Sequence, residues 1–266
     1  MAKTLGGSLF IRNAIRFGYC LTEALDSLYA LCDELSILEC GSDDGTQELL
    51  RKWVESKGYQ KRIMVEYDHA WEVGEKYDRL AILANVARSK LTTQWHFMLQ
   101  ADEVLHESAI PVIRNLIEAG GSAYFCRRLN LFVSPDMHVK LNLKGKGKPC
   151  GDTVCRLAKT DHLVFGDGES IAHPDVNALY TDRIVIFHYG YVREGAAHIA
   201  KAIDMQSWFF GPGSQPDQRI VQMRDKDNIF RPEVYFTVED LDPIPIPHPT
   251  YSTLLAERLR ALKVSG

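Results

Sequence analysis

The sequence predicts an α/β fold in which a mainly parallel sheet is flanked by helices and followed by a less regular C-terminal half. Short apolar runs, typical of strands, alternate with segments whose apolar residues recur at helical spacing. This alternation gives a β-α-β-α-β-α-β-α-β order, which is characteristic of parallel sheets with helices on both faces. The 266 residues suit one large domain.

The first half supplies most of these elements. Strands are predicted over residues 8–12, 35–39, 62–66, 95–100 and 122–127. Helices are predicted over residues 21–32, 46–58, 77–87 and 110–119. Gly58, which ends the second of these segments, and Gly120, which follows the fourth, are typical of helix ends.

The second half has weaker periodicity. Strands are predicted over residues 154–158 and 183–187, and helices over residues 194–209 and 251–263. Loops are predicted over the Gly/Lys-rich residues 142–152 and over residues 211–214, with an extended Pro-rich segment at 243–249.

Composition excludes some classes of protein. The hydrophobic fraction of 45% and the formal charge of −4 suit a globular protein and argue against a dedicated nucleic-acid surface. We expect a cytoplasmic protein, because the sequence shows neither a signal peptide nor an apolar run long enough for a transmembrane helix. The six cysteines are expected to be reduced and buried. A zinc site is an open alternative at Cys150, Cys155 and His162, although no second Cys-x-x-Cys pair supports it.

Polar clusters follow three predicted strands, where ligands of parallel sheets bind. Residues 39–46 combine carboxylates with glycines, residues 100–103 place adjacent carboxylates after an apolar strand, and His188 ends another strand. Carboxylates can accept hydrogen bonds from ribose hydroxyls or hold a divalent cation, and histidine is also a metal ligand. The same residues also suit a helix-capping turn, a solvated strand end and a structural histidine.

The order and spacing of these clusters resemble those of family 2 glycosyltransferases of the GT-A fold. The matching segments are Ile11-Arg12-Asn13-Ala14, Cys32-Asp33-Glu34-Leu35, Glu39-Cys40-Gly41-Ser42-Asp43-Asp44-Gly45-Thr46, the helix from Arg79 to Asn85, Trp95, Leu99-Gln100-Ala101-Asp102-Glu103, and His188-Tyr189-Gly190-Tyr191-Val192-Arg193. The similarity is dense over residues 9–103 and patchy afterwards. Two positions depart from the family pattern: Gln100 replaces the first Asp of the Asp-x-Asp motif, and Glu39 replaces an Asp.

The resemblance implies transfer of a sugar from a nucleotide-sugar donor, with a UDP-sugar expected, to an acceptor hydroxyl. It implies a divalent metal, manganese or magnesium, bound by Asp102 and His188. The donor nucleotide is expected to contact Arg12, Asn13, Glu39, Gly41, Asp43, Asp44, Arg79, Gln100 and Ala101. Residues 1–130 would form the nucleotide-sugar-binding half, and residues 131–266 the acceptor-side half and C-terminal extension of the same domain.

The resemblance also implies inversion at the anomeric carbon, with a general base that deprotonates the acceptor. Glu169 and Asp167 are the candidates for this base, with Asp152 as the runner-up. The lysines of residues 144–148 are candidates for closing over the diphosphate. A glycan or glycolipid acceptor is expected rather than nucleic acid, with a lipid-linked sugar or modified DNA left open.

Two other functions remain open. The first is a nucleotidyltransferase, which would normally carry a Gly-rich phosphate loop after its first strand, whereas Gly6 and Gly7 are predicted to precede that strand. The second is a non-catalytic relative that binds sugars, nucleotides or partners, a hypothesis that the uncharged Gln100 favours.

Overall fold

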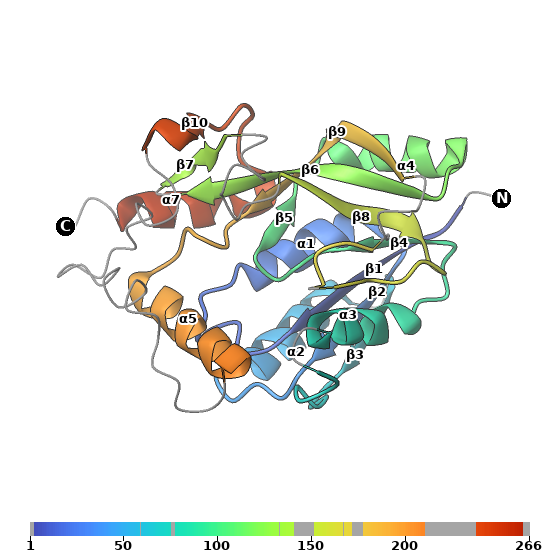
Figure 1. The fold of residues 1–266 in the computed structure, drawn as a ribbon. Helices are drawn as coiled ribbons and strands as arrows, with labels where there is room; N and C mark the ends of the chain where they lie inside the picture. Colours follow the sequence, from blue (N-terminus) through green and yellow to red (C-terminus); the bar gives the residue numbers. More distant parts are fainter. Residues whose placement is uncertain are drawn as a thin grey trace.

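The computed structural model describes residues 3–58, 60–75, 78–132, 134–140, 152–166, 168–171, 178–210 and 238–262. The first half contains β1 (Leu5–Ile11), α1 (Leu21–Leu31), β2 (Glu34–Glu39), α2 (Thr46–Lys57), β3 (Arg62–Glu66), α3 (Arg79–Ser89), β4 (Trp95–Met98), β5 (Glu103–Leu105) and α4 (Ala109–Ala119). The second half contains β6 (Ala123–Phe132), β7 (Ser134–Val139), β8 (Thr153–Lys159), β9 (Ala178–His188), α5 (Gly195–Phe210), β10 (Leu241–Pro243) and α7 (Thr253–Ala261), with short 3₁₀ turns at Val238–Asp240 and Thr250–Ser252 (Figure 1).

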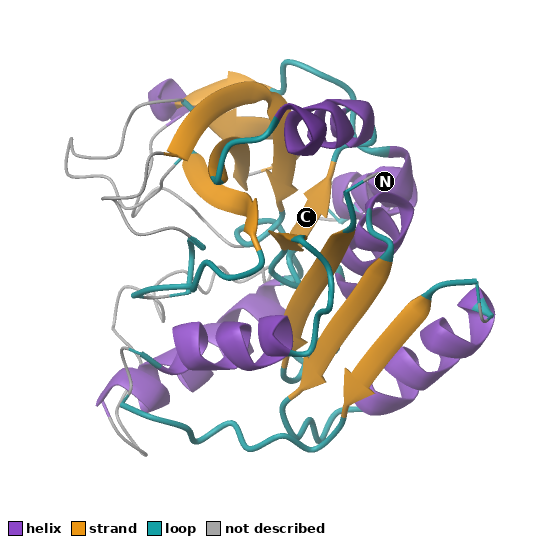
Figure 2. Ribbon diagram, turned by 90° about the vertical axis from the view of Figure 1, so that its right-hand side faces the viewer, coloured by secondary structure: helices purple, strands orange, loops and turns teal. Residues whose placement is uncertain are grey.

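The predicted parallel sheet is confirmed in the first half. Strands β3, β2, β1 and β4 lie side by side in that order, and each neighbouring pair is parallel. Their arrowheads therefore lie at one edge of the sheet (Figure 2). The residues that follow these strands meet at this carboxyl edge, where ligands of such sheets bind.

Beyond β4 the sheet becomes mixed. β8 pairs antiparallel with both β4 and β6, so it separates two strands that run in the same direction. β9 then pairs with β6 in parallel. The strand predicted at residues 122–127 is therefore present, but as β6 it is longer and is not a direct neighbour of β4. Strands from both halves of the chain thus contribute to one sheet.

Three short strands were not predicted: β5, β7 and β10. β5 and β10 have three residues each, which is too few for a hydrophobic period to be recognised. β5 matters most, because it pairs antiparallel with β9 and sets Glu103 opposite His188. This pairing brings the segment after β4 to the end of β9.

The prediction that Gly6 and Gly7 precede the first strand is wrong, because both lie inside β1. Packing explains their small size. A Cβ atom at Gly6 would lie 2.5 Å from Thr93 Oγ1, and one at Gly7 would lie 2.7 Å from Leu35 Cδ2. They are therefore buried strand residues rather than part of a phosphate loop.

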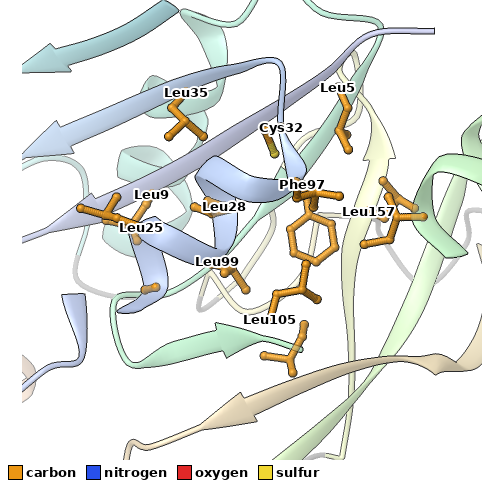
Figure 3. Close-up of a cluster of buried hydrophobic side chains, with 14 of the residues drawn as sticks. Leu5, Leu9, Leu25, Leu28, Cys32, Leu35, Phe97, Leu99, Leu105 and Leu157 are labelled. Atoms are coloured by element: carbon orange, nitrogen blue, oxygen red, sulfur yellow. The ribbon is translucent and has the colours of Figure 1, made fainter. Parts of the chain in front are cut away.

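The main hydrophobic core lies between the parallel strands and α1 and extends to β5 and β8. Figure 3 shows Leu25 and Leu28 of α1 close to Leu9 of β1, with Leu105 and Leu157 extending the same cluster. Full burial of each leucine contributes about 1.5–3 kcal/mol. This packing fixes the strands whose ends form the candidate site.

The five described cysteines are buried and free, as predicted, and burial raises the pKa of Cys40 to about 12. Cys150 lies outside the described residues, as do Tyr77 at the start of the predicted third helix, residues 142–151 of the loop predicted at 142–152, and the loop predicted at 211–214. In the part of the chain that the structure covers, no helix has the length and apolar character needed to cross a bilayer.

Candidate functional site

Asp102 and His188 meet at the carboxyl edge of the sheet. Asp102 follows β4, and His188 is the last residue of β9. The main chain joins them, since the Tyr189 N–H donates to the Asp102 carbonyl oxygen at 2.8 Å. His188 Nε2 lies 3.7 Å from Asp102 Oδ1. The structure therefore brings together the two residues predicted as metal ligands.

Two cations also contact Asp102. Arg193 donates to its Oδ2 at 3.0 Å, and the Lys201 ammonium lies 3.1 Å from the same oxygen. Burial by itself would raise the pKa of Asp102, but Lys201, His188 and Arg193 outweigh it and hold that pKa well below its usual range. Asp102 is therefore a buried carboxylate that stays ionised at neutral pH.

His188 is oriented by its neighbours. Its Nδ1 lies 2.8 Å from Asn130 Oδ1, an arrangement in which Nδ1 donates and Nε2 faces Asp102. Gly190 lies beside Nε2, so a Cβ atom at that position would lie only 2.2 Å from it. A glycine at this position keeps the space next to the imidazole open.

Asp102 and His188 can supply two ligands of a divalent cation but not a complete shell. Asp102 Oδ1 and His188 Nε2 are too far apart for a good direct hydrogen bond, yet near enough to share one cation, and oxygen with imidazole nitrogen suits manganese. Over the described ranges, no group of three or more His, Cys, Asp or Glu side chains could hold a metal. A cation here would therefore have two protein ligands and would take the rest of its shell from a ligand such as a diphosphate or from water.

Glu103 has a different environment from the adjacent Asp102. It is fully buried, its Oε1 accepts a hydrogen bond from Arg156 at 2.6 Å, and its Oε2 accepts the Gln100 N–H at 3.0 Å. Arg128 lies 3.5 Å from the same carboxylate. Glu103 therefore fixes the turn that carries Gln100 and Asp102 rather than facing a ligand.

Glu169 is a second carboxylate, besides Glu103, that contacts Arg128. The closest atoms of Glu169 and Arg128 are 3.4 Å apart. Burial opposes ionisation of Glu169, but Arg128, Arg156 and His188 lower its pKa below the ordinary value. The preceding Gly168 packs on α3 at a φ of +79°, where a Cβ atom would meet Leu80 Cβ at 2.7 Å. Of the other candidate bases, Asp167 lies outside the described residues, and Asp152 lies just before β8.

The Glu39 carboxylate organises the turn after β2. It is fully buried and accepts the N–H groups of Gly41 and Ser42 at 3.2 and 2.7 Å. It also accepts from Gln47 Nε2 at 2.9 Å and from the Asp68 N–H at 3.3 Å. Because both oxygens are engaged within the protein, Glu39 shapes the backbone that a nucleotide would meet.

The turns after β1 and β2 are joined by reciprocal hydrogen bonds. The Asn13 N–H donates to Ser42 Oγ at 2.8 Å, and the Asp43 N–H donates to Asn13 Oδ1 at 3.0 Å. Asn13 is buried and has a φ of +54°, a conformation that asparagine tolerates. Arg16 adds contacts to Asp43 and Asp44 at 2.8 and 2.6 Å. The predicted nucleoside residues thus form one connected platform.

Arg12 links this platform to helix α5. Its guanidinium lies over the Trp71 ring at 5.1 Å from the centroid and 3.4 Å from Asp204. Burial raises the pKa of Asp204, while the charges of Arg12, Arg16 and Arg79 oppose that shift. Arg79 itself contacts Glu72 at 2.5 Å. Arg12 therefore contacts a carboxylate of α5, whereas Arg79 pairs with Glu72.

Gln100 and Ala101 lie between the two halves of the site. The Gln100 main chain is fixed by hydrogen bonds to Glu103, and its side chain is half-buried, with no hydrogen bond to another residue that the structure describes. Its amide is therefore available to a ligand. Ala101 is buried and places Gln100 and Asp102 two residues apart at the strand end.

The residues that sequence reasoning missed are Lys201, Asp204, Asn130, Arg128 and Trp71. Their signals are weak, since each is one polar or aromatic residue inside a helix, strand or loop. Lys201 and Asp204 are three residues apart, which predicts a shared helix face but not what that face contacts. Only the packing of α5 against the carboxyl edge reveals that Lys201 contacts Asp102 and that Asp204 contacts Arg12.

No protein-family model matches the sequence, and no curated protein matches it. Solved structures give remote similarities. S. aureus TarS is 10% identical, with a TM-score of 0.46, over 80% of this chain and 41% of that one. A mannosyltransferase from Pyrobaculum calidifontis, in complex with GDP-Man and Mn2+, is 15% identical, with a TM-score of 0.48, over 84% of this chain and 69% of that one.

A shorter form of S. aureus TarS, in complex with UDP-GlcNAc, is 11% identical, with a TM-score of 0.43, over 82% of this chain and 71% of that one. The chain thus spans about two fifths of the first TarS structure.

Proposed function

We propose that the chain is a glycosyltransferase that transfers a sugar from a nucleoside-diphosphate donor to an acceptor hydroxyl. The observation that carries this proposal is the convergence of Asp102 and His188 beside the linked turns after β1 and β2, at the carboxyl edge of four parallel strands. This edge offers hydroxyl-binding groups and a charged centre side by side. A nucleoside diphosphate carries the complementary groups, because its ribose has hydroxyls and its phosphates are charged.

The nucleoside would bind at the platform formed by Asn13, Asp43 and Asp44, with Arg12 and Arg79 at its border. Gly41 has a φ of +69°, and the nearest atom to a Cβ there would be the His69 carbonyl oxygen at 3.8 Å, so the turn keeps its backbone accessible to a ligand. The half-buried Gln100 amide could donate to and accept from ribose hydroxyls. Glu39 would act through the turn that it holds.

The diphosphate would lie near Asp102 and His188. A divalent cation held by Asp102 Oδ1 and His188 Nε2 would neutralise negative charge on the leaving diphosphate. Arg193 and Lys201 add positive charge at the same place. Metal and nucleotide would then bind cooperatively, because neither alone completes the site.

Glu169 remains the proposed general base for an inverting reaction. Its lowered pKa keeps it ionised at neutral pH, so it can accept a hydrogen bond from an acceptor hydroxyl. The Arg128 ion pair that lowers the pKa also makes Glu169 a weaker base. We propose that residues 131–266, which supply Glu169, form the acceptor side, and that the acceptor is a glycan or glycolipid.

The test is a calorimetric and thermal-shift screen of UDP-sugars and GDP-sugars, each with manganese and with a chelator. Binding of one donor, followed by slow metal-dependent hydrolysis that releases a nucleoside diphosphate, would support the proposal. Release of pyrophosphate from a nucleoside triphosphate supplied together with a sugar phosphate, in a parallel assay, would instead indicate a nucleotidyltransferase. Binding without hydrolysis or transfer to any acceptor would indicate a non-catalytic relative, and no binding of any nucleotide would refute the nucleotide site.

A further inference from the structure

The two cations on Asp102 Oδ2 differ in how firmly they are held. Arg193 is buried and also donates to the carbonyl oxygens of Phe17 and Gly190, both at 2.6 Å. Lys201 makes one ion pair, with Asp102 at 3.1 Å, and its side chain is 22% exposed. Arg193 is therefore part of the framework, whereas Lys201 can leave Asp102 without breaking another hydrogen bond to a described residue.

Lys201 reaches the site from a helix that lies along the carboxyl edge. α5 is found on the side toward which β1 and β2 point (Figure 1). Lys201 and Asp204, three residues apart, contact Asp102 and Arg12 respectively. One face of α5 is thus directed at two residues that are proposed to bind the donor.

The Tyr19 ring makes a second contact with the Lys201 ammonium. The Lys201 nitrogen lies 4.9 Å from the Tyr19 ring centroid, and the Arg193 guanidinium lies 5.0 Å from the same centroid. Such cation–π contacts are worth about 0.5–1 kcal/mol at partly exposed positions. The ammonium can therefore shift away from Asp102 while it keeps this contact with Tyr19.

The charges around Asp102 are unbalanced. One carboxylate faces two permanent cations, so the site has an excess of positive charge before any ligand binds. An anion that approaches Asp102 would find its more accessible cation in the partly exposed Lys201 ammonium, because the Arg193 guanidinium is buried and already donates to two carbonyl oxygens. A diphosphate fits this requirement.

We propose that Lys201 binds the donor diphosphate and that its ammonium exchanges partners, contacting Asp102 in the empty site and phosphate oxygens in the loaded site. This inference rests on the proposed nucleoside-diphosphate donor. Before the donor binds, Lys201 occupies Asp102 Oδ2 and repels a divalent cation. When the ammonium moves to the diphosphate, it no longer neutralises the Asp102 carboxylate, which can then attract that cation more strongly, so Lys201 couples the two binding events.

The test compares Lys201→Met with Lys201→Arg and with Lys52→Met. Lys52 is a matched control, because it is an exposed helical lysine that pairs with Glu48 on α2, away from the carboxyl edge. Calorimetry with UDP and GDP in chelator should show at least about tenfold weaker binding for Lys201→Met, the loss expected for a charge-assisted hydrogen bond. Lys201→Arg and Lys52→Met should stay within about threefold of the wild type.

A second measurement follows manganese binding by electron paramagnetic resonance without nucleotide. Lys201→Met should bind manganese about threefold to tenfold more tightly than the wild type, because removal of the ammonium removes a like charge next to Asp102. Lys52→Met should bind it as the wild type does. The opposite signs of the nucleotide and metal effects distinguish partner exchange from general damage to the fold, which would weaken both.

The outcomes separate the two proposals. If the wild type binds UDP or GDP but Lys201→Met binds it equally well, Lys201 does not contact the diphosphate and this inference is wrong, while the proposed function stands. If manganese binding weakens in Lys201→Met, the ammonium does not compete with the metal and the exchange is wrong. If the wild type binds neither nucleotide, the proposed function fails and the inference fails with it.

Discussion

His188 Nε2 lies 3.7 Å from Asp102 Oδ1, although the two residues are 86 positions apart in the sequence. The pairing of β5 with β9 produces this proximity, because it places Glu103 opposite His188 and thereby Asp102 beside it. Asn130 then orients the imidazole from β6. Strands β5, β6 and β9 thus position Asp102 and His188 together. A substitution that shifts any of these strands should change the distance between the two side chains.

Asp102→Asn should abolish sugar transfer. The substitution keeps the size of the side chain but removes the negative charge that a divalent cation needs, and it leaves the buried Arg193 without its ionic partner. Activity is measured as release of nucleoside diphosphate with manganese. Full activity of this variant in chelator would rule out the metal-dependent mechanism.

Asp102 should also make the protein sensitive to acid. Its pKa is lower in the folded chain than the ordinary 3.8, so the unfolded chain takes up a proton first as the pH falls. The stabilisation is therefore complete above about pH 4 and is lost as the pH falls further toward the folded pKa. The difference in melting temperature between wild type and Asp102→Asn should be largest near neutral pH and should shrink below about pH 4; a constant difference would contradict this.

Gly190→Ala should disturb the imidazole more than the fold. The added Cβ would lie 2.2 Å from His188 Nε2, so the ring must move from its place opposite Asp102. We expect the manganese concentration needed for half-maximal nucleotide binding to rise at least about tenfold, by analogy with the loss of groups that orient metal ligands. His188→Ala should raise it too.

The control for this variant is Gly58→Ala, at a helix end where the added Cβ would meet no atom within 4 Å. This control should lose about 1 kcal/mol of stability, because its φ is positive, without a change in the manganese requirement. Equal manganese requirements for Gly190→Ala and the wild type would show that His188 is not a ligand.

Gln100→Asp should be tolerated or should tighten manganese binding. The Gln100 side chain is half-buried, its main chain is already fixed by Glu103, and the substitution adds one carboxylate two residues before Asp102. An additional oxygen ligand would favour a hard divalent cation. Titration with manganese in the presence of nucleoside diphosphate measures the effect, and weaker binding than in the wild type would place Gln100 away from the metal.

Asp44→Ala should lower both nucleotide affinity and stability. Asp44 Oδ1 accepts hydrogen bonds from the Thr46 N–H at 3.0 Å and from its hydroxyl at 2.6 Å, at the start of α2. Loss of this contact should cost about 1 kcal/mol of unfolding free energy, as for other helix-start substitutions. Loss of its proposed hydrogen bonds to the nucleotide should weaken calorimetric binding by about 1–3 kcal/mol.

Asp43→Ala serves as the comparison for Asp44, because Asp43 is exposed and pairs with the exposed Arg16. We expect nearly unchanged stability together with weaker nucleotide binding. If Asp44→Ala lowered stability but left nucleotide affinity unchanged, Asp44 would act only as a structural residue of the turn.

The sequence alone determined the parallel half of the fold. Runs such as residues 35–39 and 62–66 are apolar and short, and helices such as α1 repeat their buried leucines at spacings of three and four. These local patterns reflect burial on a helix face or in a sheet, so they can be recognised without tertiary information. They also place Asp102 and His188 at strand ends, and the resemblance to family 2 glycosyltransferases then implied both as metal ligands.

Only the tertiary structure decided what surrounds those residues. The three-residue β5 has too few residues for a detectable period, yet its pairing with β9 sets the distance between Asp102 and His188. Likewise, Lys201 is an ordinary helical lysine in the sequence, and its contact with Asp102 depends on how α5 packs across the carboxyl edge. Local sequence fixes which side chains lie on one face, whereas long-range packing fixes the charges they meet, and those charges govern the chemistry of this site.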